Sequence, residues 1–279
     1  MFTFHHNDLD GRCAAAIVHK KFPICKFEEM EYSKIPDFSN IEKNEKIFIV
    51  DFSFKPETMN ELLKITKNII WIDHHKTAFE YEKKYSHSIE SFLGTKDSGC
   101  ELTWKYFYHD DEMPECVRLI GDFDKWAWKF GERTSFFKEG IRCYKHSPTS
   151  AIWEELFNDD GSYIEKIIKE GKICLQYRDT INNDYCEQYG FETEFEGHKA
   201  FACGFYNFGS EKFGKRIEKY PILLSFEFNG EKYLIGLYSN QIDVSSIAKK
   251  YEGGGHKGAA GFTSDKIPFK KISKRRNNE

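Results

Sequence analysis

The chain has 279 residues, of which 40% are hydrophobic and 31% charged, and it contains 26 Phe, 15 Tyr and 5 Trp. This content is enough for packed cores in one large domain or two modest ones, and no apolar run approaches the roughly 20 residues of a membrane span. The formal net charge of −4 argues against a protein that grips long stretches of phosphate backbone, although a small nucleotide pocket remains compatible with it.

The first part of the chain predicts a parallel sheet flanked by helices, because short apolar runs alternate with helical patterns. The N-terminus begins directly with a strand-like run and has no basic or apolar leader region, so we expect no secretory signal. Pro56 indicates the start of an amphipathic helix. The expected elements are strands at 2–4, 46–50 and 68–72 and helices at 11–18, 56–66, 98–109, 114–121 and 150–189.

A second unit is expected to begin near Phe195. Asn229-Gly230 predicts a hairpin between strands 222–228 and 232–238, because a type I′ turn needs a positive φ at both central residues. Asp243 is expected to cap a short helix that leads into a glycine-rich loop. The predicted fold class is α/β, with an N-terminal parallel-sheet domain at 1–130, a helical linker at 131–194 and a smaller C-terminal α/β domain with a mixed sheet at 195–279.

The eight cysteines are scattered and form no CxxC pair, which matches neither a zinc site nor a small disulfide scaffold. We interpret them as reduced core thiols of a cytoplasmic protein. The basic tail at 266–276 is interpreted as a solvated chain end.

Carboxylates and imidazoles gather after the predicted strands, where open parallel sheets place their ligand sites. His6, Asp8 and Asp10 share parity, so in an extended segment they project to one side and suit a divalent metal. A solvated acidic turn is the alternative for this first cluster. Asp51, which directly follows the second strand, forms the second cluster, and a turn or cap residue is its alternative.

Asp73, His74 and His75 follow the third strand and form the third cluster. Adjacent residues on a strand face opposite ways, so one histidine can bind a metal while the other points toward substrate. A pair of surface histidines is the alternative. In the fourth cluster, Asp122 and Asp124 do not share a helical face, so only one should join the site, and we favour Asp122.

If the four clusters meet, at least four carboxylates share one pocket. Two such charges 4 Å apart repel by roughly 4 kcal/mol at an effective dielectric constant near 20. Two divalent ions would neutralise this charge, which is the arrangement of two-metal hydrolases.

These motifs resemble the four ordered motifs of DHH phosphoesterases, and a C-terminal loop resembles the GGGH loop of the DHH-associated domain. The resemblance covers nearly the whole chain in order. The matching segments are His6-x-Asp8-x-Asp10-Gly11, Asp51-Phe52-Ser53, Asp73-His74-His75, Asp122-x-Asp124-x-Trp126 and Gly253 to Gly261.

The resemblance implies two manganese ions per chain. One would be held by His6, Asp8 and Asp51, and the other by Asp10, Asp51, His74 and Asp122. It also implies that Asp73 orients a histidine and that His75 faces the phosphate. In the C-terminal domain it implies that Gly254, Gly255, His256 and Lys257 bind a phosphate or a neighbouring nucleotide.

The spacing His-x-Asp-x-Asp-Gly looks more like the RecJ-like and nanoRNase branches than the inorganic pyrophosphatases. We therefore expect a phosphodiesterase that cleaves short oligoribonucleotides to mononucleotides. The alternatives are hydrolysis of a cyclic mono- or dinucleotide or of 3′-phosphoadenosine-5′-phosphate, and a non-catalytic nucleotide sensor. Expected partners are short RNA or small signalling nucleotides and no membrane, with a homodimer as one candidate assembly.

Weaker candidates lie outside these motifs. Phe205 and Tyr206 are candidates for stacking on a base. Asp97-Ser98-Gly99 is expected to cap the following helix, with substrate contact as the alternative. Arg142 and His146 are expected on a solvated helical segment, with a substrate role as the alternative.

Overall fold

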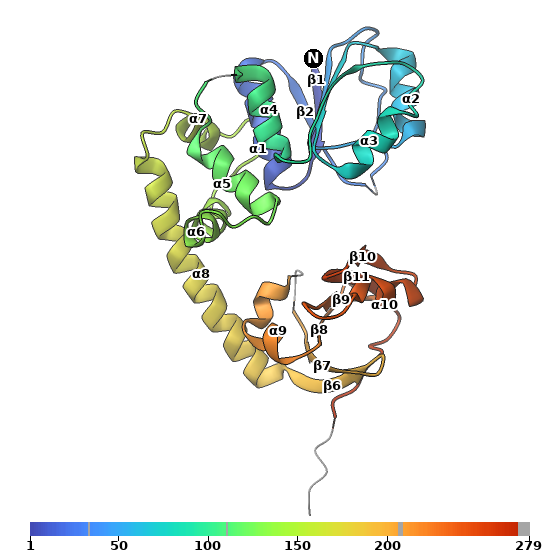
Figure 1. Cartoon of the computed structure of the whole chain (residues 1–279), viewed down its shortest axis with the longest axis vertical. Helices are drawn as coiled ribbons and strands as arrows, with labels where there is room; N and C mark the ends of the chain where they lie inside the picture. The colour runs from blue at the N-terminus through green and yellow to red at the C-terminus, as the bar shows by residue number, and fades with distance from the viewer. Residues whose placement is uncertain (33, 110, 206–208, 273–279) are drawn as a thin grey trace, which may run out of the picture. The chain divides into compact units, whose positions relative to one another are not determined.

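The computed structural model describes residues 1–32, 34–109, 111–205 and 209–272. The chain divides into two compact units, Met1–Leu175 and Gln176–Glu279, which Figure 1 shows in blue to yellow and in yellow to red. The boundary falls inside the segment 131–194 that the sequence suggests as a linker. No helix among the described residues is long and apolar enough to span a bilayer.

A five-stranded sheet forms the centre of the first unit, with the strand order β2-β1-β3-β4-β5 and every neighbouring pair parallel. The predicted parallel sheet is therefore confirmed. The edge strands β2 and β5 were not expected from the sequence. The strands are β1 (Phe2–His6), β2 (Lys26–Met30), β3 (Ile47–Val50), β4 (Ile69–Asp73) and β5 (Glu90–Leu93).

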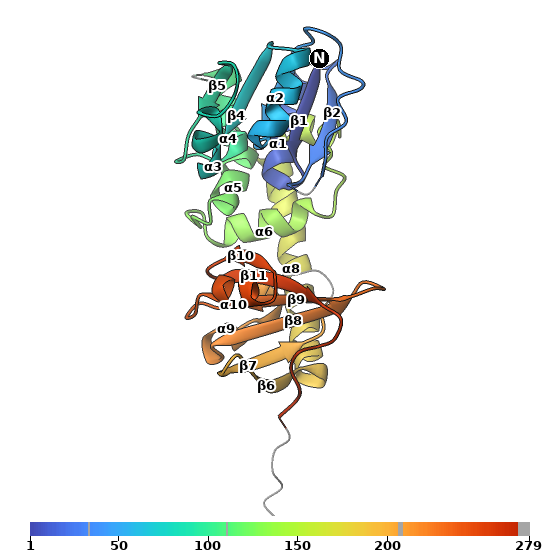
Figure 2. The ribbon, with the colours of Figure 1, turned by 90° about the vertical axis from the view of Figure 1, so that its right-hand side faces the viewer.

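Helices cover both faces of this sheet, as a buried parallel sheet requires. Phe48 and Val50 of β3 pack toward α1, α4 and α5, whereas Ile47 and Ile49 pack toward α2 and α3. Figures 1 and 2 show these helices on opposite sides of the strands. The helices are α1 (Leu9–Lys21), α2 (Pro56–Ile65), α3 (Lys76–Glu82), α4 (Gly99–Tyr108) and α5 (Glu115–Asp124).

The helical region predicted at 150–189 is divided. Gly161, with a φ of 100°, separates α7 (Ile152–Phe157) from the 28-residue α8 (Ser162–Tyr189). A further helix, α6 (Glu132–Ile141), precedes them. The first unit contains α6, α7 and the beginning of α8, which continues into the second unit.

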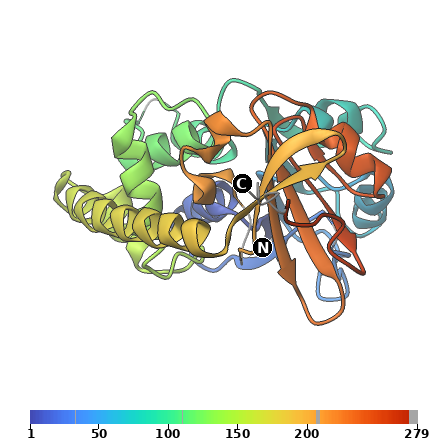
Figure 3. The same cartoon turned by 90° about the horizontal axis from the view of Figure 1, so that it is seen from below.

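The second unit contains a mixed six-stranded sheet with the order β10-β11-β9-β8-β7-β6, in which only β7 and β8 pair in parallel (Figure 3). The mixed sheet was predicted. Its strands are β6 (Phe191–Phe195), β7 (His198–Cys203), β8 (Ile222–Phe228), β9 (Tyr233–Tyr238), β10 (Gly254–His256) and β11 (Ala259–Ser264). Short helical turns lie at η1 (Ser210–Phe213), α9 (Arg216–Lys219) and α10 (Val244–Lys250).

One local prediction in this unit is refined and another is confirmed. The hairpin at Asn229-Gly230 exists, but of these two residues only Gly230 has a positive φ (100°), so the turn is not type I′. The side chain of Asn229 instead accepts hydrogen bonds from the backbone of Glu231 and Lys232 at 3.0 and 2.9 Å. Asp243 caps α10 as expected, since its side chain accepts from Ser245 N at 3.0 Å.

All eight cysteines are free thiols, but they are not all core residues. Cys143 is exposed and Cys174 is half-buried, and their Sγ atoms lie 3.5 Å apart. The prediction of core thiols is therefore wrong for this pair, because both belong to the partly solvated surface where α8 packs beside α6.

Candidate metal centre

The first three predicted clusters meet at the carboxyl edge of the parallel sheet. His6 ends β1, Asp51 follows β3 and Asp73 ends β4, so neighbouring parallel strands place these side chains at one edge. Three groups of ligand atoms arise there, each with all its atoms within 4.8 Å of one another. The groups are His6, Asp8 and Asp51; Asp10, His74 and Asp124; and Asp51, Asp73, His74 and His75.

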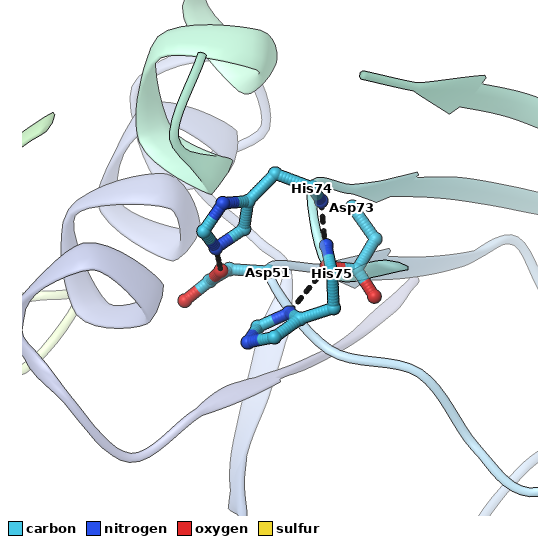
Figure 4. A group of neighbouring side chains, drawn as sticks. All are labelled: Asp51, Asp73, His74 and His75. Atoms are coloured by element: carbon cyan, nitrogen blue, oxygen red, sulfur yellow. Dashed lines mark hydrogen bonds and ion pairs between the residues drawn. The ribbon is translucent and has the colours of Figure 1, made fainter. Parts of the chain in front are cut away.

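Asp51 lies at the centre of this arrangement and is only 1% exposed. Its Oδ1 is 3.1 Å from His74 Nε2, and Figure 4 shows the carboxylate and the imidazole facing each other. His74 Nε2 also lies 3.5 Å from Asp124 Oδ2. Both Asp51 oxygens, His74 Nε2 and Asp124 Oδ2 are buried without a hydrogen-bond partner among the residues that the structure describes.

The electrostatics of Asp51 and Asp124 show that burial and negative charge outweigh the positive charge around them. Burial, followed by repulsion from Asp10 and Asp8, raises the pKa of Asp51 well above its ordinary value and that of Asp124 to about 8. Burial lowers the pKa of His74, which favours the neutral imidazole that metals bind. Buried carboxylates and a neutral imidazole without partners are the donor set of a divalent cation site, so a metal fits these residues.

A hydrogen-bonded turn holds the first of these groups. His6 Nδ1 lies 2.7 Å from Asp8 Oδ2 and 3.9 Å from Asp51 Oδ2. Asp8 Oδ1 accepts from Gly11 N at 2.9 Å and so caps α1. A Cβ at Gly11 would lie 2.4 Å from the His6 carbonyl oxygen, so the tight turn at this position requires glycine.

The N-terminus of α4 holds the carboxylate of Asp10. Asp10 Oδ1 accepts from Ser98 Oγ at 2.8 Å and from Cys100 N at 3.1 Å, and Oδ2 accepts from Gly99 N at 2.7 Å. Helix N-termini favour negative charge, so this contact fixes a carboxylate beside the other acids. Ser98 caps α4 as predicted, but its contact with Asp10 joins segments far apart in sequence and was not foreseen.

Gly99 also packs directly against Asp51, and this contact gives a testable expectation. A Cβ at residue 99 would lie 2.4 Å from Asp51 Cβ and 2.5 Å from Asp51 Oδ1. We expect Gly99→Ala to displace Asp51 and to weaken divalent-metal affinity by about ten- to a hundredfold, the range for residues that support metal ligands. Calorimetric titration of the purified protein with Mn²⁺ would measure this loss.

Gly94→Ala is the matched control, because its Cβ would meet only the flexible end of Leu102, at 3.1 Å. Equal metal affinity in the two variants would contradict the support role of Gly99.

Asp73 holds His75 rather than the metal-facing His74 ring. Asp73 Oδ1 accepts from His75 Nδ1 at 2.7 Å, and Oδ2 accepts from Ser53 Oγ (Figure 4 shows the contact between Asp73 and His75). Burial alone would lower the pKa of His75, but the Asp73 carboxylate outweighs it and raises that pKa. His75 therefore carries a proton more readily than an ordinary histidine near neutral pH.

The structure does not bring Asp122, the favoured fourth-cluster ligand, into any of the three groups of ligand atoms. Its buried carboxylate accepts hydrogen bonds from Thr134 Oγ1 at 2.6 Å, Lys129 N at 2.8 Å and Phe130 N at 3.3 Å. These bonds outweigh burial and lower the pKa of Asp122. Asp124, the alternative, joins Asp10 and His74 instead.

The predicted phosphate-binding residues lie in the second unit. Gly254, Gly255 and His256 form the exposed edge strand β10, and Lys257 follows in the turn to β11. The expected loop is thus a short hairpin. Gly255 has a φ of 138°, and a Cβ there would lie 2.5 Å from Ala260 Cα, so only glycine fits.

The weaker candidates are placed as follows. Phe205 is buried in the core of the second unit, so it does not present a face for stacking, and Tyr206 lies outside the described residues. Arg142 is exposed at the end of α6, as expected. His146 is half-buried, with Nε2 3.0 Å from Arg12 and Nδ1 2.8 Å from the Tyr144 carbonyl oxygen.

Comparison with known proteins finds a family model that part of the first unit resembles. Residues 1–120 match the model of the DHH family, N-terminal domain. Uncharacterized protein R106 of Acanthamoeba polyphaga mimivirus is 25% identical over 244 residues, which cover 82% of this chain and 56% of that protein. Oligoribonuclease NrnB of Bacillus subtilis (strain 168) is 22% identical over 291 residues, covering 92% of this chain and 71% of that protein. The chain thus spans little more than half the length of the first of these relatives.

Two solved structures share the fold. The pGpG-specific phosphodiesterase PggH from Vibrio cholerae aligns with a TM-score of 0.56 and 12% identity over 95% of this chain and 92% of that chain. The DHH domain of PF0399, a member of the s1p family of ribosomal proteins, aligns with a TM-score of 0.58 and 15% identity over 93% of this chain and 81% of that chain.

Proposed function

Because residues 1–120 match the model of the DHH family, N-terminal domain, we propose that this chain is a metal-dependent phosphodiesterase that hydrolyses short oligoribonucleotides to mononucleotides. One observation carries the proposal. Four buried ligand atoms of Asp51, His74 and Asp124 converge without a hydrogen-bond partner among the described residues, as a cation site requires. The names of NrnB, an oligoribonuclease, and PggH, a phosphodiesterase for pGpG, support short RNA as the substrate class.

Two Mn²⁺ ions per chain fit the donor sets. His6, Asp8 and Asp51 would hold one ion, and Asp10, Asp51, His74 and Asp124 the other, with Asp51 shared. Imidazole and carboxylate ligands suit Mn²⁺ and also accept Co²⁺ or Fe²⁺. When bound, such ions neutralise the clustered carboxylates, lower the pKa of water and polarise phosphate oxygens.

The side chains around this site have distinct tasks in the proposed reaction. His75, fixed through Nδ1 by Asp73, would donate a proton or hydrogen bond to a phosphate or leaving oxygen. Asp10 stays oriented because three donors at the start of α4 hold it. In the second unit, taken by itself, His256 and Lys257 would bind a phosphate or a nucleotide, with Gly255 permitting the close approach of backbone.

The charge of the chain favours a short substrate. The net charge of −4 disfavours the multiple backbone contacts that a long strand requires, and it fits a two- to few-nucleotide substrate. We therefore propose a nanoRNase-like specificity. Hydrolysis of cyclic nucleotides or of 3′-phosphoadenosine-5′-phosphate uses the same metal chemistry and is tested alongside it.

Mn²⁺-dependent hydrolysis of a small substrate panel, followed by liquid chromatography, tests the function. The panel contains a 5′-phosphorylated diribonucleotide, a pentaribonucleotide, a long RNA, cyclic di-AMP, cyclic AMP and 3′-phosphoadenosine-5′-phosphate. We expect rapid turnover of the two shortest RNAs and none in the Asp51→Asn and His74→Ala variants. Turnover confined to a cyclic or 3′-phosphorylated nucleotide would change the proposed substrate. If the protein neither turns over any substrate nor binds metal, the proposed enzymatic function is refuted.

A further inference from the structure

A half-exposed tyrosine lies beside the candidate metal centre without a task in the proposed reaction. Tyr32 follows β2, whose carboxyl end lies at the same sheet edge as that of β1. Its ring centroid is 5.7 Å from that of His6 and 6.2 Å from that of His75. In the proposed reaction His6 holds an ion and His75 contacts the phosphate.

The ring of Tyr32 is firmly supported on one side. It stacks on Phe52 with centroids 5.2 Å apart and an interplanar angle of 29°. Phe52 is itself buried and packs edge-on against Phe54 at 5.3 Å, so the support is part of the core. Tyr32 as a whole residue is nevertheless 48% exposed, so part of it is open to solvent. An aromatic ring that rests on a buried aromatic side chain and belongs to a partly exposed residue is suited to stacking on a planar ligand.

We propose that Tyr32 forms a base-binding subsite, in which its ring stacks on the nucleobase of the nucleotide whose phosphate lies at the metal centre. The proposal rests on the proposed function. Because the Tyr32 ring centroid lies 5.7 and 6.2 Å from the two imidazole centroids, a base stacked on this ring would lie beside the candidate metal centre. Every base has a π-face, so this subsite should accept all four bases and select for the presence of a base rather than for its identity.

A second exposed aromatic residue, next to the fourth cluster in sequence, is an alternative candidate for stacking on a base. Trp126 is 60% exposed and follows Asp124 by two residues. Within the described residues its ring contacts are with Phe123 and Trp128, at 5.7 and 5.0 Å, and not with the imidazoles of the site. Tyr32 is therefore the better placed of the two for a base attached to the bound phosphate.

Steady-state kinetics of Tyr32→Ala on a diribonucleotide test the subsite. We expect KM to rise about ten- to a hundredfold, the loss that removal of one base-stacking residue produces, while kcat stays at the wild-type value. Tyr32→Phe, which keeps the ring, should restore most of the affinity. A dinucleotide with an abasic residue on the metal-site side should be hydrolysed equally by wild type and Tyr32→Ala, because it offers no base to stack.

Matched controls and a binding measurement keep the outcomes distinct. Tyr177→Ala removes a tyrosine that is 70% exposed on α8 and should leave KM unchanged. Calorimetric binding of adenosine 5′-monophosphate to the Mn²⁺-loaded protein gives a readout independent of turnover, and Tyr32→Ala should weaken it by the same factor. If the wild-type protein binds adenosine 5′-monophosphate but cleaves no substrate, the proposed reaction is refuted. The effect of Tyr32→Ala on this binding still tests the subsite.

Three results would overturn the base subsite: an unchanged KM in Tyr32→Ala, an equal loss on the abasic substrate, or a loss confined to Trp126→Ala. Wild-type protein that neither binds nor cleaves any nucleotide would overturn both the subsite and the function.

Discussion

Asp51→Asn is expected to abolish Mn²⁺-dependent hydrolysis and, at the same time, to raise the melting temperature of the metal-free protein. Asp51 belongs to two of the three groups of ligand atoms and would be shared by both proposed ions, so losing its charge should lower kcat by at least about a thousandfold. In the absence of metal the same charge is unfavourable, because Asp51 is buried near Asp10, Asp8, Asp73 and Asp124. Asparagine keeps the shape of the side chain and tolerates the φ of 53° at this position.

The pH dependence of stability follows from the raised pKa values of Asp51 and Asp124. Their pKa values in the folded metal-free protein lie above the ordinary value of about 4, and that of Asp124 is about 8. Between about pH 4 and about pH 8 the folded state therefore binds more protons than the unfolded state. The stability contributed by these groups is complete below about pH 4 and is lost as the pH rises toward about 8.

Bound metal reverses this trend, since it replaces the protons on the carboxylates. We expect Mn²⁺ to raise the melting temperature more at about pH 8 than at about pH 5.5, and we expect Asp51→Asn to lose most of this metal-induced shift. Thermal melts in chelator and in Mn²⁺, at both pH values, measure each effect. A metal-free Asp51→Asn protein that melts below wild type would contradict the proposed repulsion.

The central sheet could be predicted because its inner strands are continuous apolar runs. Ile47–Val50 is buried throughout, and Ile69–Asp73 is likewise buried on both faces, which leaves a clear signal in the sequence. The edge strands Lys26–Met30 and Glu90–Leu93 are partly exposed and carry charged residues, so they lack this signal. Their existence depends on pairing with neighbouring strands, which local sequence does not encode.

The candidate site could likewise be predicted only in part from the sequence. Strand ends meet at one sheet edge, so the convergence of His6, Asp51 and His74 followed from the order of the motifs. The support given to Asp10 by Gly99 and the position of Tyr32 depend on contacts between distant segments. The choice between Asp122 and Asp124 depended on where the chain after α5 returns, which periodicity cannot show.

Asn substitutions at Asp122 and Asp124 are expected to have opposite effects on stability and activity. Asp124→Asn should lower kcat by about a hundred- to a thousandfold, because it removes a metal ligand. It should also stabilise the metal-free protein, because the pKa of Asp124 is raised by burial and by Asp10 and Asp8. Asp122→Asn should instead destabilise the fold by about 2–3 kcal/mol, since its buried carboxylate accepts three hydrogen bonds.

Thermal melts, Mn²⁺ titrations and kcat measured on both variants distinguish a ligand from a structural carboxylate. Thr134→Val is the matched control, because it removes one donor to Asp122 without touching the metal-ligand groups. It should lower the melting temperature in the same direction as Asp122→Asn and leave metal affinity unchanged. If Asp122→Asn loses metal while Asp124→Asn retains it, the ligand assignment must return to Asp122, and the loop from Lys129 to Thr134 must rearrange when metal binds.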